Sequence, residues 1–457
     1  MHAASHTIEA TKSIESAIAV MDHLGRTYLY VVEEGKLLGI VRLNELRREI
    51  LHGTDPKSAL SRYAGKNYVT LNVKELADQG IVESRSAEAD LLDLGHIPVV
   101  GDAAALVDMV EVQSRESRAQ HSRRPPTTNV RNVLIIGGAG YLGSVLTEEL
   151  LHYHYKVRVF DSLIYGKAGI ERFIGSPQFE LIVGDIRNIE QILGAIDGMD
   201  AVVLLAAIVG DPASSARPRQ TIETNLLATQ AVALACKSQH VNRLIFASTC
   251  SVYGRSDTVP DEESELNPIS LYARLKISAE ESIRAMANGH FSPTILRLST
   301  LYGYSPRMRF DLVVNTMTMK AYVDRKITIF GGEQWRPLLH VRDAGRAFRS
   351  VLEAPIDTVS NQVFNVGSSA QNYQVKAIGD IVAGSIDGVR VLVEHNTIDD
   401  RDYRVSFAKI ESALGFRTQE TVRNAVRDIY QKLKNGTIRN PNAKVFYNHY
   451  FDSTEEQ

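Results

Sequence analysis

The sequence has few cysteines, no excess of charge of either sign and no long apolar run. Its 457 residues include only two cysteines, Cys236 and Cys250, which excludes a disulfide framework or a four-cysteine zinc site, and we expect no metal centre. Lys and Arg total 51 against 54 Asp and Glu, a balance that argues against a general nucleic-acid-binding protein. No apolar run reaches the ~18–20 residues that span a bilayer, and the N-terminus lacks the basic and apolar regions of a signal peptide. We therefore expect a soluble, cytoplasmic protein that binds neither membrane nor nucleic acid.

The composition is that of an ordinary globular protein, and the length suits two or three folding units. Hydrophobic residues make up 44% and charged residues 23%, so a largely disordered or fibrous chain is excluded. The clearest change in composition lies at about residues 113–130, a polar stretch with paired arginines and paired prolines. Because proline fixes φ and lacks a backbone donor, this stretch predicts an extended linker. We therefore divide the chain into a module at 1–112, a linker at 113–130 and a second domain at 131–457.

The N-terminal module contains an internal repeat. Apolar spacing predicts, in order, a helix, two strands and a charged amphipathic helix at 13–23, 28–32, 37–41 and 44–52. A weaker copy follows, with a short helix and two strands at 91–94, 96–100 and 105–110. Two similar units of roughly 50 residues indicate a repeated α+β module.

Two apolar segments of this module, Tyr-Leu-Tyr-Val-Val-Glu-Glu-Gly-Lys-Leu-Leu-Gly-Ile-Val at 28–41 and Ile-Pro-Val-Val at 97–100, resemble a tandem pair of cystathionine-β-synthase-type (CBS) domains. The resemblance implies a regulatory module that binds an adenine nucleotide in the cleft between the repeats. Two positions depart from the family pattern, because Arg42 replaces a hydroxyl residue and Glu45 replaces the aspartate that binds the ribose. The second repeat also ends early, without an equivalent acidic residue. Nucleotide binding and a purely dimerising role both stay open.

After the linker, short apolar strands alternate with helices. The expected strands lie at 132–136, 156–161, 179–183, 201–206 and 243–247, and the expected helices at 141–152, 220–239 and 271–287. Apolar strands without polar alternation, separated by helices, predict a parallel sheet that is buried on both faces. We therefore expect an α/β domain with a Rossmann-type, doubly wound parallel sheet. Past about residue 300 this regularity is lost, which predicts a small C-terminal lobe that binds substrate.

A glycine-rich turn follows the first of these strands. Gly137, Gly140 and Gly143 have the spacing Gly-x-x-Gly-x-x-Gly, with Tyr141 and Leu142 at the start of the helix. Glycine allows a tight turn and a close approach of the backbone to a pyrophosphate, while the helix N-terminus offers unpaired N–H groups. The strand before the turn and the helix after it are the context of a dinucleotide-binding site. We expect these five residues to bind the cofactor.

The identity of the cofactor is predicted from Asp161, which ends the second strand 18 residues after Gly143. A carboxylate there can accept hydrogen bonds from both hydroxyls of the adenosine ribose, and it would repel the additional phosphate of NADP. Ser162 follows, and no arginine stands beside it in the sequence. We therefore expect NAD rather than NADP.

Two further segments carry the residue types of an oxidoreductase active site. Tyr272 and Lys276 are four residues apart, so they lie on one face of the predicted helix. A nearby positive charge stabilises phenolate and lowers the pKa of tyrosine towards the range of a general base. Ser248 and Thr249 follow the strand at 243–247 and supply hydroxyls on the active-site side of the sheet. Together the segments predict an active site with Tyr272 as its base.

From about residue 131 to the C-terminus, these motifs resemble an extended short-chain dehydrogenase/reductase of the nucleotide-sugar epimerase/dehydratase family. The matching pieces are the glycine turn, Asp161, Gly184-Asp185, Leu205-Ala206-Ala207, Asn225, Ser248-Thr249, Tyr272 with Lys276, and His340-Val-Arg-Asp343. The resemblance implies that Asp185 holds the adenine edge and that the cofactor site also includes Ala206, Ala207, Asn225 and Lys276. It implies that Thr249 and Tyr272 hold the reacting sugar hydroxyl and that Ser248 contacts the substrate.

Departures from the family pattern narrow the reaction. Dehydratases and decarboxylases of the family usually have an acidic residue shortly after the hydroxyl residue, whereas Cys250 and Ser251 follow Thr249 here, which disfavours dehydration. Thr300 stands where 4-epimerases often have asparagine, so the contact with the substrate is altered. Arginine suits a diphosphate because it forks onto phosphate oxygens while it stays charged. The candidates for this contact are Arg307, Arg309, Arg336 and Arg401.

The predicted reaction is transient oxidation of a nucleotide-linked sugar at C4, with Tyr272 as base, Thr249 orienting the oxygen and Lys276 tuning Tyr272. An epimerase would return the hydride to the other face of the sugar, whereas a 4-oxidase would stop halfway and a 4-ketoreductase would run one way. A non-catalytic sensor of NAD and nucleotides is the alternative from another class, although such a sensor has no chemical need for these three residues. We also expect a homodimer or a higher homo-oligomer.

Overall fold

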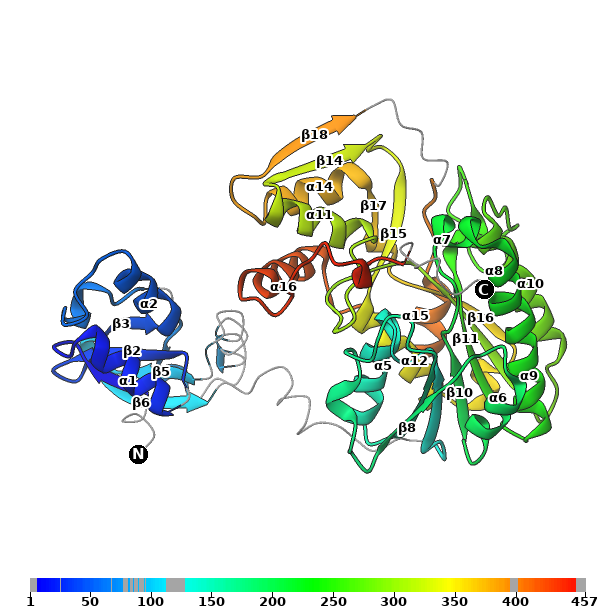
Figure 1. Cartoon of the computed structure of the whole chain (residues 1–457), viewed down its shortest axis with the longest axis horizontal. Helices are drawn as coiled ribbons and strands as arrows, with labels where there is room; N and C mark the ends of the chain where they lie inside the picture. Colours follow the sequence, from blue (N-terminus) through cyan, green and yellow to red (C-terminus); the bar gives the residue numbers. More distant parts are fainter. Residues whose placement is uncertain are drawn as a thin grey trace, which may run out of the picture. The chain divides into compact units, whose positions relative to one another are not determined.

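A computed structural model of the chain describes residues 6–24, 26–66, 68–76, 81–82, 85, 89, 94, 96–111, 128–394 and 402–448. The chain divides into two compact units, Met1–Arg123 and Arg124–Gln457 (Figure 1). The division falls inside the segment 113–130, most of which lies outside the described residues. Each unit has hydrophobic cores of its own.

The N-terminal unit contains two small sheets with the same topology. In the first, β1 (Thr7–Glu9) is parallel to β2 (Tyr28–Glu33), which is antiparallel to β3 (Lys36–Arg42). In the second, β4 (Leu71–Asn72) is parallel to β5 (His96–Val100), which is antiparallel to β6 (Leu106–Glu111). The helices beside the first sheet are α1 (Ile14–Leu24) and α2 (Leu43–Leu51). The repeat that the sequence predicts is therefore present, while the helix expected at 91–94 lies mostly outside the described residues.

Strand β2 joins the two halves of this unit. Leu29 and Val31 are buried in a core with α1 and α2, whereas Tyr28 and Tyr30 belong to a core with β5, because successive side chains of a strand point to opposite faces. The Tyr30 hydroxyl donates to the carbonyl oxygen of His96 at 2.8 Å. The N–H of His96 donates to the Tyr28 hydroxyl oxygen at 3.1 Å. The two tyrosines therefore connect the sheets by hydrogen bonds as well as by packing.

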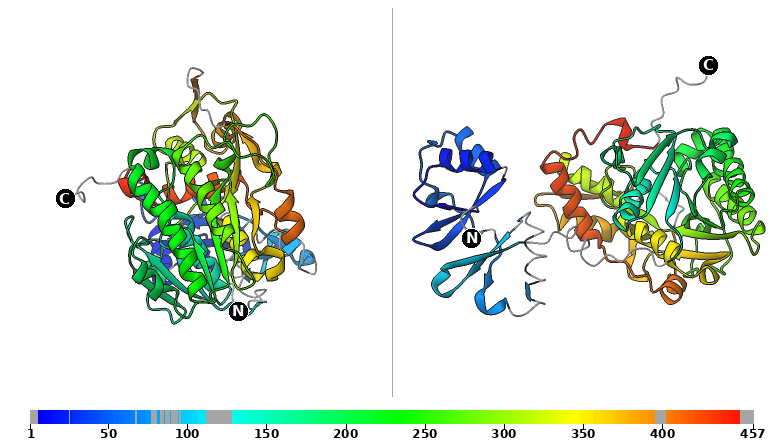
Figure 2. Two further views of the ribbon diagram at one scale, coloured as in Figure 1. Left: turned by 90° about the vertical axis from the view of Figure 1, so that its right-hand side faces the viewer. Right: turned by 90° about the horizontal axis from the view of Figure 1, so that it is seen from below.

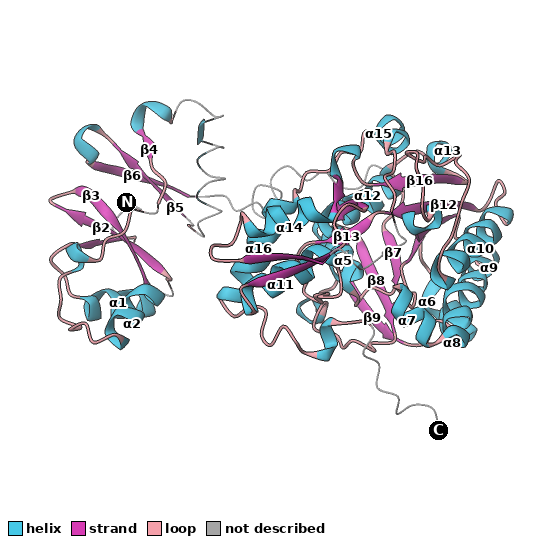
Figure 3. Cartoon of the chain, turned by 90° about the horizontal axis from the view of Figure 1, so that it is seen from above, coloured by secondary structure: helices cyan, strands magenta, loops and turns pink. Residues whose placement is uncertain are grey.

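The second unit is built on a seven-stranded sheet in which each neighbouring pair of strands is parallel (Figure 3). The order across the sheet is β16-β12-β11-β10-β7-β8-β9. The bounds are β7 (Asn132–Ile136), β8 (Lys156–Asp161), β9 (Phe179–Val183), β10 (Ala201–Leu204), β11 (Arg243–Thr249), β12 (Ser292–Leu298) and β16 (Gln362–Val366). The order runs outward in both directions from β7 and β10, so the sheet is doubly wound and the Rossmann-type prediction is confirmed. Ligands of such sheets bind at the carboxyl ends of the strands, where the order reverses.

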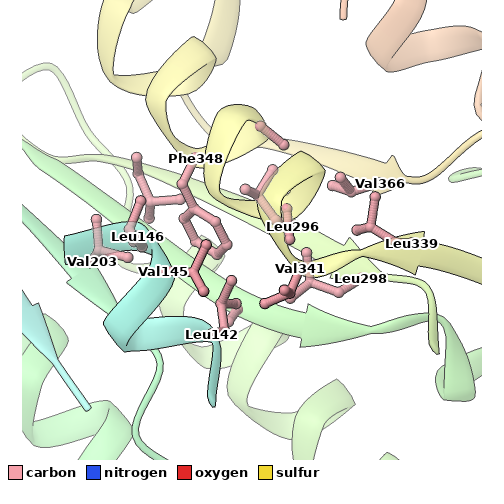
Figure 4. Close-up of a cluster of buried hydrophobic side chains, with 14 of the residues drawn as sticks. Leu142, Val145, Leu146, Val203, Leu296, Leu298, Leu339, Val341, Phe348 and Val366 are labelled. Carbon is pink, nitrogen blue, oxygen red and sulfur yellow. The ribbon is translucent and has the colours of Figure 1, made fainter. Parts of the chain in front are cut away.

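Helices cover both faces of this sheet. On one face, α5 (Tyr141–His152) and α12 (Val341–Glu353) share a core with the strands, and Figure 4 shows Val145 and Phe348 from these helices packed beside Val203 and Leu296. On the other face lie α6 (Ile189–Ile196), α9 (Ala228–Ser238) and α10 (Leu271–Ala285), which form the second core (Figure 2). None of the helices in the described residues is long and apolar enough to cross a bilayer.

Several expected elements have different bounds, and helix α10 ends two residues earlier than expected. Strand β10 ends two residues early, because the N–H groups of Leu205 and Ala206 both donate to the carbonyl oxygen of Ile136 and turn the chain away. Strand β11 continues to Thr249, since its last residues still pair with β12. The helix expected at 220–239 begins earlier, as α8 (Pro218–Ile222), and reaches α9 through a π-helical turn at Glu223–Leu227.

The C-terminal lobe has two small sheets and a core of its own. One sheet contains β13 (Thr300–Tyr302), β15 (Trp335–His340) and β17 (Asn372–Gln374), and the other contains β14 (Lys326–Phe330) and β18 (Arg390–Glu394). Their core includes α11 (Val313–Val323), α14 (Val375–Ala383) and α16 (Val422–Lys434). Three short helices elsewhere in the second unit are α7 (Asp211–Ala216), α13 (Ile356–Val359) and α15 (Ala408–Leu414). The expected mixed lobe is present, but β16 and α12 return to the main sheet and interrupt it.

We expect a fragment of residues 128–457 to fold without the N-terminal module, because the sheet and the cores on both of its faces lie within this range. The fragment should show a thermal unfolding transition and should bind NAD within about threefold of the affinity of the full chain. Circular dichroism and calorimetry measure the two properties. A fragment that stays unfolded, or that loses NAD binding, would contradict this independence.

Candidate active site

Close packing explains two glycines of the turn at the carboxyl end of β7. Gly137 has φ +93°, and a Cβ atom there would lie 2.6 Å from the backbone nitrogen of Ala206. A Cβ atom on Gly143 would lie 2.2 Å from the carbonyl oxygen of Gly137, because α5 starts directly against the turn. Both positions therefore require glycine, and the turn lies at the point where the strand order reverses.

Gly140 has a different role, since a Cβ atom there would make only an ordinary contact, 3.5 Å from Gly137. It precedes α5, and no side chain among the described residues caps this helix. The N–H groups of the first turn have no partner within the helix, so they are available to an anion. The side chains of the next two residues point elsewhere, because the Tyr141 hydroxyl donates to Gly303 at 2.6 Å and Leu142 lies in the core. The turn thus fits a dinucleotide pyrophosphate through its backbone.

Asp161 ends β8 beside this turn. One carboxylate oxygen accepts the N–H of Ala139 at 2.9 Å, and the other accepts the N–H of Leu163 at 2.8 Å. Burial raises the pKa of Asp161, whereas these two hydrogen bonds and the Arg307 guanidinium lower it. Each oxygen keeps lone pairs for a further donor, as a ribose contact requires. Asp161 also holds the glycine turn in place, which the sequence did not indicate.

Asp185, predicted to hold the adenine edge, is engaged by its neighbour Arg187. The guanidinium donates to both carboxylate oxygens, with a shortest distance of 2.6 Å, and holds the pKa of Asp185 below its usual range. The N–H of Asp185 donates to the side chain of Gln191 at 2.9 Å. Only the lone pairs that Arg187 does not use remain to accept a hydrogen bond from the adenine.

Asn225 lies in the π-helical turn and fixes the loop that follows β10. Its side chain accepts the N–H of Ile208 and donates to the carbonyl oxygen of the same residue, both at 2.8 Å. The loop held in this way contains Ala206 and Ala207, and Ala206 is the residue that approaches Gly137. The predicted cofactor residues Ala206, Ala207 and Asn225 therefore lie together next to the glycine turn.

Thr249 and Tyr272 meet at the carboxyl end of β11. The Thr249 oxygen accepts the N–H of Ser251 at 3.1 Å and so begins the 3₁₀ turn η7 (Cys250–Tyr253). The Thr249 side chain also lies close enough to Tyr272 to lower the pKa of the phenol. The two side chains that were predicted to hold the sugar oxygen are thus near each other.

Lys276 lies one turn after Tyr272 on α10. Its Nζ donates to the carbonyl oxygen of Ala247 at 2.7 Å, and it lies 4.4 Å from the centre of the Phe246 ring and 5.9 Å from the centre of the Tyr272 ring. The helical spacing therefore places both side chains at the end of the same strand, as predicted.

Burial, rather than the charge of Lys276, has the largest effect on the pKa of Tyr272. Burial raises the pKa of Tyr272, and the groups that lower it are Arg309 and Thr249. Burial also lowers the pKa of Lys276 to about 7, against an opposing effect of Glu280. An ammonium group that is partly deprotonated near neutral pH stabilises phenolate less than a permanent charge would. Helical spacing does not report burial, which here decides both pKa values.

Ser248 lies on the other side of its strand from Thr249, because successive side chains alternate. Its hydroxyl donates to the carboxylate of Glu280, and the side chain is buried. The predicted contact with the substrate is therefore replaced by a contact inside the protein. The strand-end position indicated the right region, but only the pleat decides which hydroxyl faces the site.

Glu280 belongs to a buried polar network that the sequence analysis missed. Arg297 donates to both of its carboxylate oxygens, with a shortest distance of 2.7 Å. Arg297 also donates to the Tyr253 hydroxyl at 2.9 Å, and this hydroxyl donates to Asn365 at 2.8 Å. The network joins α10, β12, η7 and β16. An arginine within an apolar strand, and a glutamate one turn after Lys276, were the signals that could have found it.

Two further neighbours of Tyr272 come from segments that carried no motif. Asp211 in α7 and Tyr403 each raise the pKa of the Tyr272 phenol. The hydroxyls of Ser251 and Tyr403 lie 3.4 Å apart, so Tyr403 borders the same region as Thr249. Among the described residues, no group of three or more His, Cys, Asp or Glu side chains is arranged to hold a metal ion.

Arg309 and Arg336, two of the four candidate arginines, each make hydrogen bonds within the protein. Arg309 binds Asp311 through hydrogen bonds of 3.0 and 2.6 Å, and it is close enough to lower the pKa of Tyr272. Arg336 is buried in β15, where it donates to the carbonyl oxygen of Trp335 at 2.8 Å. Arg309 is therefore the candidate whose charge the structure brings to the catalytic tyrosine.

The other candidate substrate residues have separate positions. Arg307 lies on the cofactor side, close enough to Asp161 to lower the pKa of its carboxyl group. Thr300 lies in β13, paired with Leu338 of β15. Arg401 lies outside the described residues. Arg307 and Arg309 lie near the same groups, since each of them lowers the pKa of Tyr165 and of Asp311.

The doubly wound sheet, the glycine turn at a helix N-terminus and the Thr249–Tyr272–Lys276 cluster define a dinucleotide-binding domain of the short-chain dehydrogenase/reductase class. Residues 133–367 match the sequence model of the NAD dependent epimerase/dehydratase family, and the chain belongs to this family. Its cofactor is NAD. Residues 1–52 match the model of the CBS domain, which confirms the N-terminal resemblance.

Known relatives share the second unit. The chain is 28% identical over 264 residues to an uncharacterized UDP-glucose epimerase, YtcB of Bacillus subtilis, which covers 54% of this chain and 79% of the relative. It is 29% identical over 240 residues to UDP-glucuronic acid decarboxylase 1 of Xenopus tropicalis, over 50% of this chain and 56% of the relative. The solved structure of MoeE5 in complex with UDP-glucose and NAD matches with a TM-score of 0.58 and 27% identity, over 67% of this chain and 99% of that chain. Epimerase and decarboxylase names both occur, so similarity alone does not decide the reaction.

The buried Lys276 should make stability depend on pH. Its pKa falls from 10.5 in the unfolded chain to about 7 in the fold, so the unfolded state holds more protons between these values. The contribution of Lys276 to the free energy of unfolding is therefore most favourable above pH 10.5 and declines as the pH falls to about 7, by a few kcal/mol in total. Urea unfolding of Lys276→Met across this range should lack that decline. The exposed Lys237→Met is the control, and equal pH slopes for Lys276→Met and wild type would contradict the assignment.

Proposed function

We propose that the chain oxidises and then reduces a nucleotide-linked sugar through a 4-keto intermediate, with epimerisation at C4 as the net reaction. The observation that carries the proposal is the position of Thr249, Tyr272 and Lys276 together at the carboxyl end of β11. A protein that only senses NAD has no need for such an arrangement. The relatives named for UDP-glucose, YtcB and MoeE5, support a nucleotide sugar as the substrate class.

In this reaction NAD supplies the hydride acceptor and, in the return step, the hydride donor. The Tyr272 oxygen takes the proton of the sugar hydroxyl, while the Thr249 hydroxyl orients that oxygen. Burial raises the pKa of Tyr272, whereas the Arg309 charge and the nearby Thr249 side chain favour its phenolate. Lys276 uses one donor on Ala247 and keeps its other donors for the bound molecules.

Arginine charge and a carboxylate near the tyrosine suit a substrate with a diphosphate and hydroxyls. We propose that Arg309, Arg336 and Arg401 bind the diphosphate of the substrate. Thr300 is proposed to contact its sugar. Arg309 is supported by its proximity to Tyr272. Arg336 is supported by its burial in the lobe that packs beside the main sheet. A guanidinium remains charged at every physiological pH, so it can hold a diphosphate throughout the reaction.

Dehydration is disfavoured in this proposal because no carboxyl group follows Thr249. The Cys250 thiol is buried, donates to the backbone carbonyl oxygen of Arg297 at 3.2 Å and has its pKa raised by burial to about 12. The Ser251 hydroxyl is hydrogen-bonded to Thr249 at 3.1 Å. Neither group is an acid that could protonate a leaving hydroxyl at neutral pH. A 4-oxidase or a 4-ketoreductase stays as the alternative, since either would use the same three catalytic residues.

The N-terminal module is proposed to bind an adenine nucleotide and to regulate the enzyme. Burial raises the pKa of Tyr30 and Arg42 lowers it, so a guanidinium lies close to the tyrosines of β2. Such a charge suits a nucleotide phosphate. Glu45 is exposed in the first turn of α2 and supplies an acidic group near the same strand end. The alternative is a module that only joins two chains.

Self-association is part of the proposal, with a homodimer or a higher homo-oligomer as the assembly. Three apolar side chains on α8, the π-helical turn and α9 are strongly exposed, namely Ile222 at 39%, Leu227 at 52% and Leu234 at 55%. Apolar side chains gathered on neighbouring turns favour association with another surface. A second copy of the chain is the occupant that we propose.

Replacement of Tyr272 by Phe tests the catalytic proposal. Tyr272→Phe should keep NAD affinity and lower turnover by at least ~10²-fold, because only the hydroxyl that accepts the sugar proton is lost. The assay incubates the protein with a panel of nucleotide sugars and follows NADH absorbance and product stereochemistry. We expect a C4 epimer without a dehydrated product. Tyr153→Phe, at the far end of α5, is the control, and near-normal turnover of Tyr272→Phe would rule out the base.

Calorimetry and light scattering test the N-terminal module. With NAD saturating the second unit, AMP, ADP or ATP should release heat on binding to the full chain but not to the fragment 128–457. Arg42→Ala should weaken this binding, whereas Arg48→Ala on the same unit should not. Absence of heat would favour the dimerising alternative. A fragment that stays dimeric in light scattering would assign self-association to the exposed face of α8 and α9.

A further inference from the structure

Arg307 is a buried arginine whose guanidinium is only partly paired by protein groups. Its side chain is 4% exposed, and its guanidinium carbon lies 3.8 Å from the centre of the Tyr165 ring. Its Nη2 donates to the side-chain oxygen of Asn448 at 2.7 Å. Its Nε has no hydrogen-bond partner among the described residues. Because an unpaired buried donor is unfavourable, this arrangement points to a partner that is not a protein group.

Packing places Arg307 at the glycine turn rather than deep in the substrate lobe. The Ser305 hydroxyl donates to the carbonyl oxygen of Tyr141 at 2.7 Å and lies 2.9 Å from the hydroxyl oxygen of Ser144. The segment that leads to Arg307 therefore lies on the first turn of α5. The guanidinium thus belongs to the end of the site that binds the cofactor nucleotide.

A second contact gives the same location. A Cβ atom built on Gly169 would lie 3.4 Å from the Cβ atom of Arg307 and 3.1 Å from the carbonyl oxygen of Ala139. Ala139 is the residue whose N–H binds Asp161. Arg307 and the strand-end carboxylate are therefore neighbours of the same short segment.

The charges of the two residues act on each other. Burial raises the pKa of Asp161, and Arg307 lowers it. Burial and Arg309 lower the pKa of Arg307 to about 10, whereas Asp161 is among the groups that raise it. Arg307 is thus still charged at neutral pH. The negative charge that was expected to reject NADP is accompanied by a positive one from a distant part of the chain.

We infer that Arg307 limits how strongly the protein discriminates against NADP, by attracting the 2′-phosphate that Asp161 repels. Asp161 accepts the ribose hydroxyls of NAD, while the guanidinium offers its donors to the phosphate in NADP, a geometry to which arginine is suited. Asn448 and Tyr165 are positioning residues that hold the guanidinium. The inference rests on the proposed contact of Asp161 with the ribose.

The test measures the dissociation constants of NAD and NADP for the full chain by calorimetry. Arg307→Gln should weaken NADP binding roughly tenfold and change NAD binding by less than about twofold, because only NADP has the additional phosphate. The ratio of the NADP to the NAD dissociation constant should therefore increase. Arg307→Lys, which keeps the charge, should restore most of the NADP affinity. The exposed Arg417→Gln removes the same charge elsewhere and should leave the ratio unchanged.

A second variant keeps the test valid if Arg307→Gln does not fold. Asn448→Ala removes the hydrogen bond and keeps the guanidinium, so it should widen the preference by about threefold, as expected for one lost positioning contact. Asn442→Ala, in the same C-terminal segment, is its control. If Arg307 only supports the fold, these variants will change both dissociation constants by the same factor, and the inference is then overturned.

The carboxylate variant separates this inference from the assignment of Asp161. In the wild-type background, Asp161→Ala should lower the ratio of the NADP to the NAD dissociation constant. In the Arg307→Gln background the same replacement should lower this ratio less, because the 2′-phosphate then has no guanidinium to bind. Equal narrowing in both backgrounds would reject the role of Arg307 alone. No change of preference in Asp161→Ala would reject the ribose contact, and with it this inference.

Discussion

The buried ion pair between Glu280 and Arg297 holds helix α10, which carries Tyr272 and Lys276, against the central sheet. Glu280 lies one turn after Lys276 on α10, and Arg297 lies in strand β12 of the central sheet. Both side chains are buried, so the loss of either partner would leave a charge without compensation, at a cost of about 3–5 kcal/mol. The same carboxylate accepts the Ser248 hydroxyl at the end of β11. The position of Tyr272 relative to Thr249 depends on this pair, because both are attached to the elements that it joins.

Burial affects the pKa values of Tyr272 and Lys276 more strongly than the spacing of the two residues does. It raises the pKa of Tyr272 and lowers that of Lys276 to about 7. Both shifts favour neutral side chains, as a site of low polarity requires. The Arg309 charge and the Thr249 side chain act in the opposite direction on the pKa of the phenol. A base in such a site depends on neighbours that favour its charged form, as Thr249 and Arg309 do for Tyr272, whereas Asp211 and Tyr403 disfavour that form.

The cofactor side of the site is connected to the end of the chain. Asp161 binds the glycine turn and, at the same time, feels the charge of Arg307. Arg307 is held by Asn448, while Phe446, two residues before it, packs edge-on against Phe310 with ring centres 5.7 Å apart. The C-terminal segment therefore supports the cofactor end of the site, although it lies beyond the residues that match the family.

By itself the sequence determined the class of the second domain and its cofactor. Strands β7, β8 and β9 and helix α5 have the predicted bounds, because apolar runs and glycine turns are local signals. The Tyr272–Lys276 spacing also placed two side chains on one helix face correctly. Only the tertiary structure decided that Ser248 points to Glu280, that Lys276 loses most of its basicity, and that Arg307 stands beside Asp161. These properties depend on burial and on contacts between segments far apart in the chain, and the energy of a charge follows from those surroundings, which no local pattern contains.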